Sequence, residues 1–181
     1  MKRLIVLGFF WCLLFYANGQ QSYEYNKVVT HGDTITYLRS EMTPITGTVF
    51  KMHDNENLEY EKPYVNGKLE GILKIYFDNK QLSREENYVN NKLEGIKREW
   101  SNENQLLIID YYKNGLLEGL QKHFYFNWQL SFIANYVNGE KQGEFKSYYE
   151  NGQLKYIANY VNDNWDGEVK WFYQNGQLET I

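Results

Sequence analysis

Cationic side chains recur at one fixed spacing along the chain, and a column of cations could bind an anionic polymer or lipid headgroups. Acidic side chains recur four positions earlier. Pairing between the two columns is the alternative interpretation, because opposite charges on neighbouring strands attract and keep a sheet soluble. The net charge of −4 at pH 7 favours pairing. The cations are Lys74, Arg98, Lys122, Lys146 and Lys170, and the acids are Glu70, Glu94, Glu118 and Asp166.

The acidic column does not predict catalysis. A glycosidase needs two carboxylates about 5–9.5 Å apart in different surroundings. Acids two strands apart lie about 10 Å from each other, and nothing in their similar surroundings would separate their pKa values. The three histidines, His31, His53 and His123, have no metal-ligand spacing, and the chain has no nucleophile motif. We therefore expect no enzyme, no metal and no cofactor.

Aromatic side chains form a third column, which could stack on sugar rings or grip the apolar side chains of a partner. The alternative is that these rings pack the units of the fold against one another. A second aromatic column follows one residue later, and so on the opposite face of a strand. The first column is Tyr76, Trp100, Phe124, Tyr148 and Phe172, and the second is Phe77, Tyr125, Tyr149 and Tyr173.

All these columns follow one repeat of 24 residues. Six tandem units predict a repeat array over 40–181, and 20–39 is interpreted as a degenerate half-unit that caps it. The recurring glycines are expected to mark tight turns or close backbone approaches. They are Gly47, Gly71, Gly95, Gly119, Gly143 and Gly167, and the recurring leucines are Leu58, Leu82, Leu106, Leu130, Leu154 and Leu178.

Each unit contains two strand signals and two turn signals. In 143–159, an aromatic-rich run after Gly143 leads to the turn at 150–153, and a second run from Leu154 leads to the turn at 161–164. Asn-Gly supplies the positive φ angles that hairpin turns need. Consecutive hairpins should pair into an elongated, twisted, single-layer antiparallel meander, so the predicted fold class is all-β. Which face is the more buried stays open.

The first 19 residues have the layout of a secretory signal peptide. Lys2 and Arg3 precede an apolar run from Leu4 to Tyr16, and Gly19 follows. That run is shorter than the about 20 residues of a membrane-spanning helix. We expect cleavage near Gly19 and export to the periplasm, the cell surface or the medium. The net negative charge also predicts no binding of nucleic acid and disfavours membrane lipid.

The motifs in 64–71 (Tyr-Val-Asn-Gly-Lys-Leu-Glu-Gly) and 150–154 (Glu-Asn-Gly-Gln-Leu) resemble the bacterial variant of the MORN repeat, and the resemblance covers 40–181. Unit 88–111 departs from it, since Asn91 replaces the first turn glycine and Glu103-Asn104 the second Asn-Gly. The resemblance implies a β-hairpin array with protein or lipid contacts and no catalytic residues. Similar bacterial proteins are described as antitoxins of toxin–antitoxin systems, of the YwqK type.

Together these observations predict an exported, non-enzymatic repeat protein that acts as a scaffold or binding module for another protein. One alternative is an antitoxin or immunity protein that occludes a toxin. A further alternative is a glycan-binding module that uses an exposed aromatic column. The candidate binding residues are the first aromatic column and the cationic column.

Overall fold

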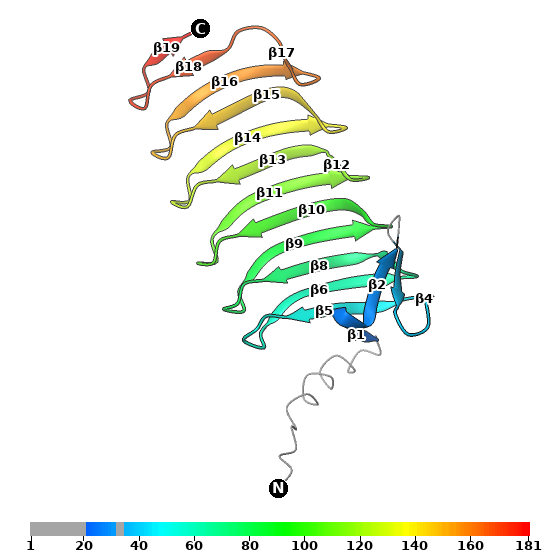
Figure 1. The fold of residues 1–181 in the computed structure, drawn as a ribbon. Coiled ribbons are helices and arrows are strands. Elements are labelled where there is room, and N and C mark those ends of the chain that lie inside the picture. The colour runs from blue at the N-terminus through cyan, green and yellow to red at the C-terminus, as the bar shows by residue number, and fades with distance from the viewer. Residues whose placement is uncertain (1–20, 32–34) are drawn as a thin grey trace.

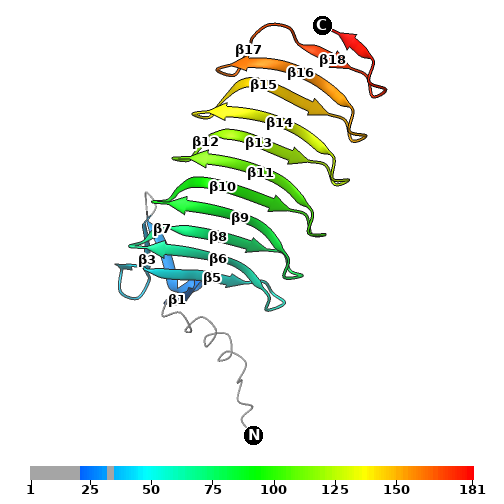
Figure 2. The same ribbon diagram turned by 180° about the vertical axis from the view of Figure 1, so that it is seen from behind.

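The computed structural model describes residues 21–31 and 35–181, so the predicted signal peptide at 1–19 lies outside the described residues. Nearly all of the described chain forms one long open sheet in which hairpin follows hairpin from one end of the molecule to the other (Figure 1). Seen from behind, no other described element lies in front of the strands of this sheet (Figure 2). The predicted all-β meander of hairpin repeats in a single layer is confirmed.

The strands have the following bounds. At the N-terminal end are β1 (Ser22–Glu24), the 3-10 helix η2 (Tyr25–Lys27), β2 (Val28–His31), β3 (Ile35–Leu38) and β4 (Thr43–Pro44). The meander runs through β5 (Gly47–Met52), β6 (Leu58–Val65), β8 (Gly71–Tyr76), β9 (Leu82–Val89), β10 (Lys92–Trp100), β11 (Leu106–Lys113), β13 (Gly119–Phe124), β14 (Leu130–Val137), β15 (Glu140–Tyr148), β16 (Leu154–Val161), β18 (Lys170–Phe172) and β19 (Leu178–Thr180). Short strands beside the turns are β7 (Lys68–Leu69), β12 (Leu116–Leu117) and β17 (Asn164–Trp165).

Five of the six recurring glycines lie in bulges beyond the turns and not in the turns themselves. Each of the five stands four residues beyond the second turn residue, as Gly143 does after Gly139, and all six have a φ between +77° and +146°. A Cβ added at Gly143 would meet no atom within 4 Å. The requirement there is therefore the left-handed backbone conformation, which only glycine adopts without strain. Of the two predicted roles, the tight turn was wrong in position, whereas the close backbone approach is found at Gly47, where an added Cβ would overlap the Gln21 carbonyl.

The N-terminal segment does not have the form of a repeat. Strand β1 pairs with β5 in parallel, and β2, β3 and β4 form a separate small antiparallel sheet. This small sheet docks on the turn between β6 and β7, where Gly67 donates its N–H to Ile45 and accepts one from Thr36, both at 2.7 Å. A Cβ at Gly67 would lie 2.6 Å from the Ile35 side chain, so close approach requires a glycine here. The segment covers the edge of β5 that the meander leaves open.

The two faces of the sheet differ in burial. Phe145 pairs with Ala158, and both are buried with Ala134 and Tyr160 in one cluster. We call this side the core face. The neighbouring pair, Lys146 and Ile157, points to the other side. We call that side the ladder face, because it carries the cationic column and the first aromatic column.

Stacked rings on the core face take the place of a second layer. Phe132 stacks on Phe145 with ring centroids 5.6 Å apart, and Phe145 stacks on Tyr156 at 5.1 Å. Tyr156 in turn stacks on Trp171 at 4.6 Å. The stack therefore runs across strands of successive repeats, and each ring is shielded from water by the next one along the array.

We expect Gly143→Val to lower the free energy of unfolding by about 1–2 kcal/mol, because a β-branched residue is strained at positive φ. Gly143→Asn is the matched control and should cost less, since asparagine tolerates this conformation and occupies it at several turns. Urea unfolding followed by circular dichroism measures both. Equal midpoints for the wild type and the valine variant would contradict this role of φ.

Candidate binding surfaces

The acidic column caps the hairpin turns of the next repeat. The side-chain oxygens of Glu70 and Glu94 each accept the backbone N–H of an asparagine 20 residues later, at 2.8 Å from Asn90 and Asn114 respectively. Glu118 does the same for Asn138. These acids do not pair with the cationic column, so the ion pairs expected from the sequence between the two columns do not form. Their function is to satisfy backbone donors that the turn leaves free.

A second link joins the same turns. The N–H of Gly115 donates to Leu93 of the preceding repeat at 2.8 Å. Where Asn91 replaces the turn glycine, its N–H makes the equivalent bond to Leu69, and its side-chain oxygen also accepts the Leu69 N–H at 2.7 Å. The departure of unit 88–111 from the MORN pattern thus adds a contact between repeats. The φ of +66° at Asn91 is one that asparagine tolerates.

At the opposite ends of the strands, side chains cap carbonyls of the next repeat. Asn127 donates to the carbonyl of Glu150 at 2.6 Å. The second aromatic column does likewise, as Tyr125 donates its hydroxyl to the carbonyl of Tyr148 at 2.8 Å and Tyr149 to that of Phe172 at 2.8 Å. The hydroxyls of Tyr125 and Tyr149 are therefore engaged in joining repeats.

The cationic column lies on the ladder face, and four of its five members pair with other acids. Lys74 lies 3.3 Å from Glu61, and Arg98 lies 2.8 Å from Glu85, across neighbouring strands. Lys146 and Lys170 pair with acids two residues earlier in the chain, Glu144 and Glu168. These exposed pairs contribute little stability, but they neutralise those positions.

Lys122 is different, since no ion pair joins it to any residue of 21–31 or 35–181. Its neighbours on the adjacent strands are Ile109 and Ile133. Ile109 is equivalent to Glu61 and Glu85, and Leu120 is equivalent to Glu144 and Glu168, the acids that pair in the other repeats. Ile109, Leu120 and the exposed Tyr111 line a shallow hollow of about 220 Å³ beside Lys122, and Glu118 and Gly119 complete it. The surface here is apolar around one unpaired cation.

The first aromatic column is half-buried on the same face. Each ring faces a recurring leucine across the hairpin, as Tyr148 faces Leu154 and Phe124 faces Leu130. Tyr76 and Lys74 share one face because both contact Oε1 of Glu61, Tyr76 with its hydroxyl at 2.8 Å. The column therefore packs against the leucines and still presents part of each ring on the ladder face.

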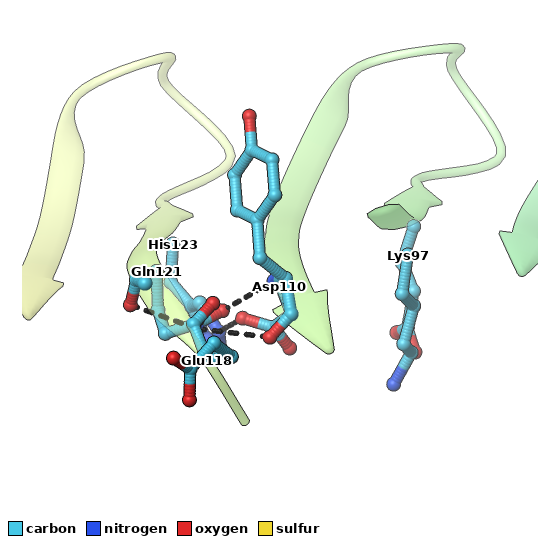
Figure 3. Close-up of polar contacts among 8 residues, drawn as sticks. Lys97, Asp110, Glu118, Gln121 and His123 are labelled. Carbon is cyan, nitrogen blue, oxygen red and sulfur yellow. Dashed lines mark hydrogen bonds and ion pairs between the residues drawn. The ribbon is translucent and has the colours of Figure 1, made fainter. Parts of the chain in front are cut away.

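On the core face, the middle of the array is polar. Gln121 is almost fully buried, and its amide accepts the Tyr111 N–H at 2.8 Å and donates to the Tyr111 carbonyl at 3.2 Å (Figure 3). Strands β11 and β13 pair directly only at Ile108 and Ile109, so this side chain completes their connection. His123 donates its Nε2 hydrogen to the buried carboxylate of Asp110 at 2.9 Å, because a carboxylate can only accept.

Charged groups continue this polar region toward the N-terminus. The buried carboxylate of Glu86 accepts the hydroxyl of Tyr88 at 3.0 Å, and Lys97 pairs with Glu99 at 2.8 Å. Burial by itself would lower the pKa of Lys97, but the hydrogen bond and charge of Glu99 outweigh burial and raise this pKa. Burial, the charge of Glu86 and the hydrogen bond to it raise the pKa of Tyr88 to about 12. Arg84 joins the same network through Glu86 and Glu99, although its buried Nε makes no hydrogen bond to any described residue.

The residues expected to bind, which are the cationic and first aromatic columns, share the ladder face. The acids Glu70, Glu94 and Glu118 cap turns instead, and Asp166 accepts a hydrogen bond from the Asn159 amide. Within the described residues, no group of three or more histidine, cysteine or acidic side chains could hold a metal ion. The same residues include no helix long and apolar enough to cross a membrane. Leu120 and Tyr111 were missed from the sequence, although Tyr111 departs from its column, in which Asn87, Asn135 and Asn159 are the equivalent residues.

The class that this geometry defines is an open array of β-hairpin repeats. A family model described as MORN repeat variant matches residues 69–90, 141–162 and 165–181, and each of these stretches is similar to that repeat. No curated protein matches the sequence. Among solved structures, similarity extends to a chain of "Crystal structure of GtfA/B complex bound to UDP and GlcNAc", with 12% identity and a TM-score of 0.26. The match covers 77% of this chain and 27% of that chain.

Capping by the acidic column is tested by Glu94→Ala, which removes the acceptor of the Asn114 N–H. We expect it to lower the free energy of unfolding by about 1 kcal/mol. Glu94→Gln is the control, because Gln142 already accepts the N–H of Asn162 at the equivalent position. The glutamine variant should stay close to the wild type in urea unfolding. A glutamine variant as destabilised as the alanine variant would instead indicate ion pairing.

Raised tyrosine pKa values predict a loss of stability in alkali. Tyr88 and Tyr156 both have a pKa of about 12 in the folded protein, for Tyr156 because of burial and then the nearby Tyr160, against about 10 in an unfolded chain. Their contribution is fully present below pH 10 and is lost as the pH rises through about 12. Urea midpoints should fall across this window, and less steeply for Tyr88→Phe. An unchanged slope in that variant would contradict the assignment.

Proposed function

We propose that this chain is an exported, non-enzymatic repeat protein that binds another protein through its ladder face. Repeats of the MORN type are generally protein- or membrane-binding modules. We choose the ladder face because Lys122 has no ion-pair partner there among the described residues and is surrounded by apolar side chains. Leu120 and Tyr111 are about two-fifths exposed beside it. The core face is occupied by its own stacked rings and ionic network and leaves less surface free.

The composition of this surface indicates the chemistry of the partner. Apolar side chains would fill the hollow between β11 and β13, and an acidic group would pair with Lys122. Nucleic acid fits poorly, since the chain carries a net charge of −4. Further contacts to the half-exposed rings of the first aromatic column would add along the array, as binding surfaces of repeat proteins do.

An antitoxin or immunity protein is the special case in which the partner is a toxin. Export suits protection in the periplasm or at the cell surface. This case is distinguished by expressing the partner alone and then with this chain, and measuring growth. Relief of toxicity supports the special case, whereas a harmless partner supports a scaffold.

The test begins with the full chain carrying a C-terminal tag in its native host. After cell fractionation, we expect a stoichiometric protein partner in the envelope or medium. Binding of the purified partner should weaken about tenfold or more with Leu120→Asp or Lys122→Ala. Glu168→Ala, at the position equivalent to Leu120 two repeats later, is the matched control and should bind normally.

Circular dichroism of each variant checks that the fold persists. Normal binding by both Leu120→Asp and Lys122→Ala would overturn the choice of surface. Recovery of the full-length chain in the cytoplasm would overturn export. An oligosaccharide that quenches the tryptophan fluorescence and competes with the partner would favour the glycan-binding alternative.

A further inference from the structure

One turn of the array carries two aromatic side chains where every other repeat has polar residues or glycine. It is Phe126-Asn127-Trp128, between β13 and β14. Phe126 is 74% exposed and Trp128 is 65% exposed, among the most exposed large apolar residues of the described chain. The residues equivalent to Phe126 are Asp54, Asp78, Asn102, Glu150 and Gln174, and those equivalent to Trp128 are Glu56, Lys80, Asn104, Gly152 and Gly176.

The fold gains nothing from these two side chains. Trp128 has a φ of +69°, in the left-handed region that disfavours a bulky residue, whereas Gly152 occupies the equivalent site at +81° without strain. Both rings are mostly in water, so burial does not offset that strain. A tryptophan in this conformation costs folding energy and exposes apolar surface, which is the pattern of a residue retained for contact with something else.

The turn is held in one conformation. Trp128 donates its N–H to the Tyr125 carbonyl at 3.1 Å, and Gln129 donates its N–H to the Asn127 side chain at 3.1 Å. The Asn127 amide also donates to Glu150 of the next turn at 2.6 Å. The backbone that carries the two rings is therefore preorganised, and a partner need not order it on binding.

The surroundings of the turn indicate what it binds. The adjacent turns present the exposed acids Glu103 and Glu150, which would repel an anionic lipid surface. The Asn127 amide between the two rings bonds to Glu150, and the Gln105 amide bonds to the carbonyl of Tyr125. Neither amide is therefore free to recognise sugar hydroxyls. Apolar rings between carboxylates instead match a protein surface that combines aliphatic and basic side chains.

We propose that Phe126 and Trp128 anchor a protein partner whose binding site is an aliphatic pocket bordered by lysine or arginine. The rings fill the pocket, and Glu103 and Glu150 pair with the basic border. This inference rests on the chain being a protein-binding module, as proposed above. The site is a different one, at the turns on the edge of the array, while Lys122 and Leu120 lie on the ladder face of the sheet.

The test is selection of a random 12-residue peptide library displayed on phage against the full chain, with depletion on the variant Phe126→Ser/Trp128→Gly. We expect enriched peptides that combine aliphatic with basic residues. Synthetic copies should shift the tryptophan emission to shorter wavelength and bind at least about tenfold more weakly to Trp128→Gly. Trp128→Gly should unfold at the same or a higher urea concentration than the wild type, because it removes the strained φ.

A second pair of variants separates this site from the ladder face. Lys122→Ala should bind the selected peptides normally, and Glu103→Gln/Glu150→Gln should weaken them and reduce the salt dependence. Acidic or uncharged peptides, equal binding by Trp128→Gly, or no enrichment would overturn the proposal. So would a larger emission shift with vesicles of phosphatidylcholine and phosphatidylglycerol, or with oligosaccharide, than with the peptides.

Discussion

The structure depends on the capping of each turn by the neighbouring repeat. A single open layer has no second layer to cover its turns, and every turn leaves backbone groups without partners in its own hairpin. Glu70, Glu94 and Glu118 reach one repeat forward to accept an asparagine N–H, and at the other end Asn127 and Tyr125 reach forward to a carbonyl. Each unit thereby completes the next one. This requirement accounts for a spacing of 24 residues that does not vary.

Much of the fold could be predicted from the sequence, because positive-φ turn residues and strand runs recur at one period. The sequence did not predict that each capping side chain reaches toward the next repeat. A strand model places Glu94 beside Arg98 in sequence and suggests that they pair, whereas the bulge at Gly95 turns the Glu94 side chain toward the turn of the next repeat. The parallel pairing of β1 was also inaccessible, because residues 22–24 carry no repeat signal that fixes their direction.

The candidate sites were also predictable from the sequence only in part. The cationic and aromatic columns were visible as columns, and their presence on one face followed from strand alternation. Lys122 is distinguished by apolar residues at both positions that supply a pairing acid in other repeats, since Ile109 replaces Glu61 and Glu85, and Leu120 replaces Glu144 and Glu168. Phe126 and Trp128 are likewise exceptions in polar columns. In a repeat array, the residues that recur at the fixed period report mainly on folding. Residues that depart from the repeat without stabilising the fold are the better guide to binding.

The connection of the strands has a mechanical consequence. The two ends of the described chain lie at opposite ends of the sheet (Figure 1), so a force that pulls them apart acts across the strands and loads one pair of strands at a time. Each released repeat of 24 residues would lengthen the chain by about 80 Å at full extension. Such an array unfolds from one end, one repeat at a time, and the remaining repeats keep their capping hydrogen bonds. A partner bound to the middle of the array would halt this unfolding at its binding site.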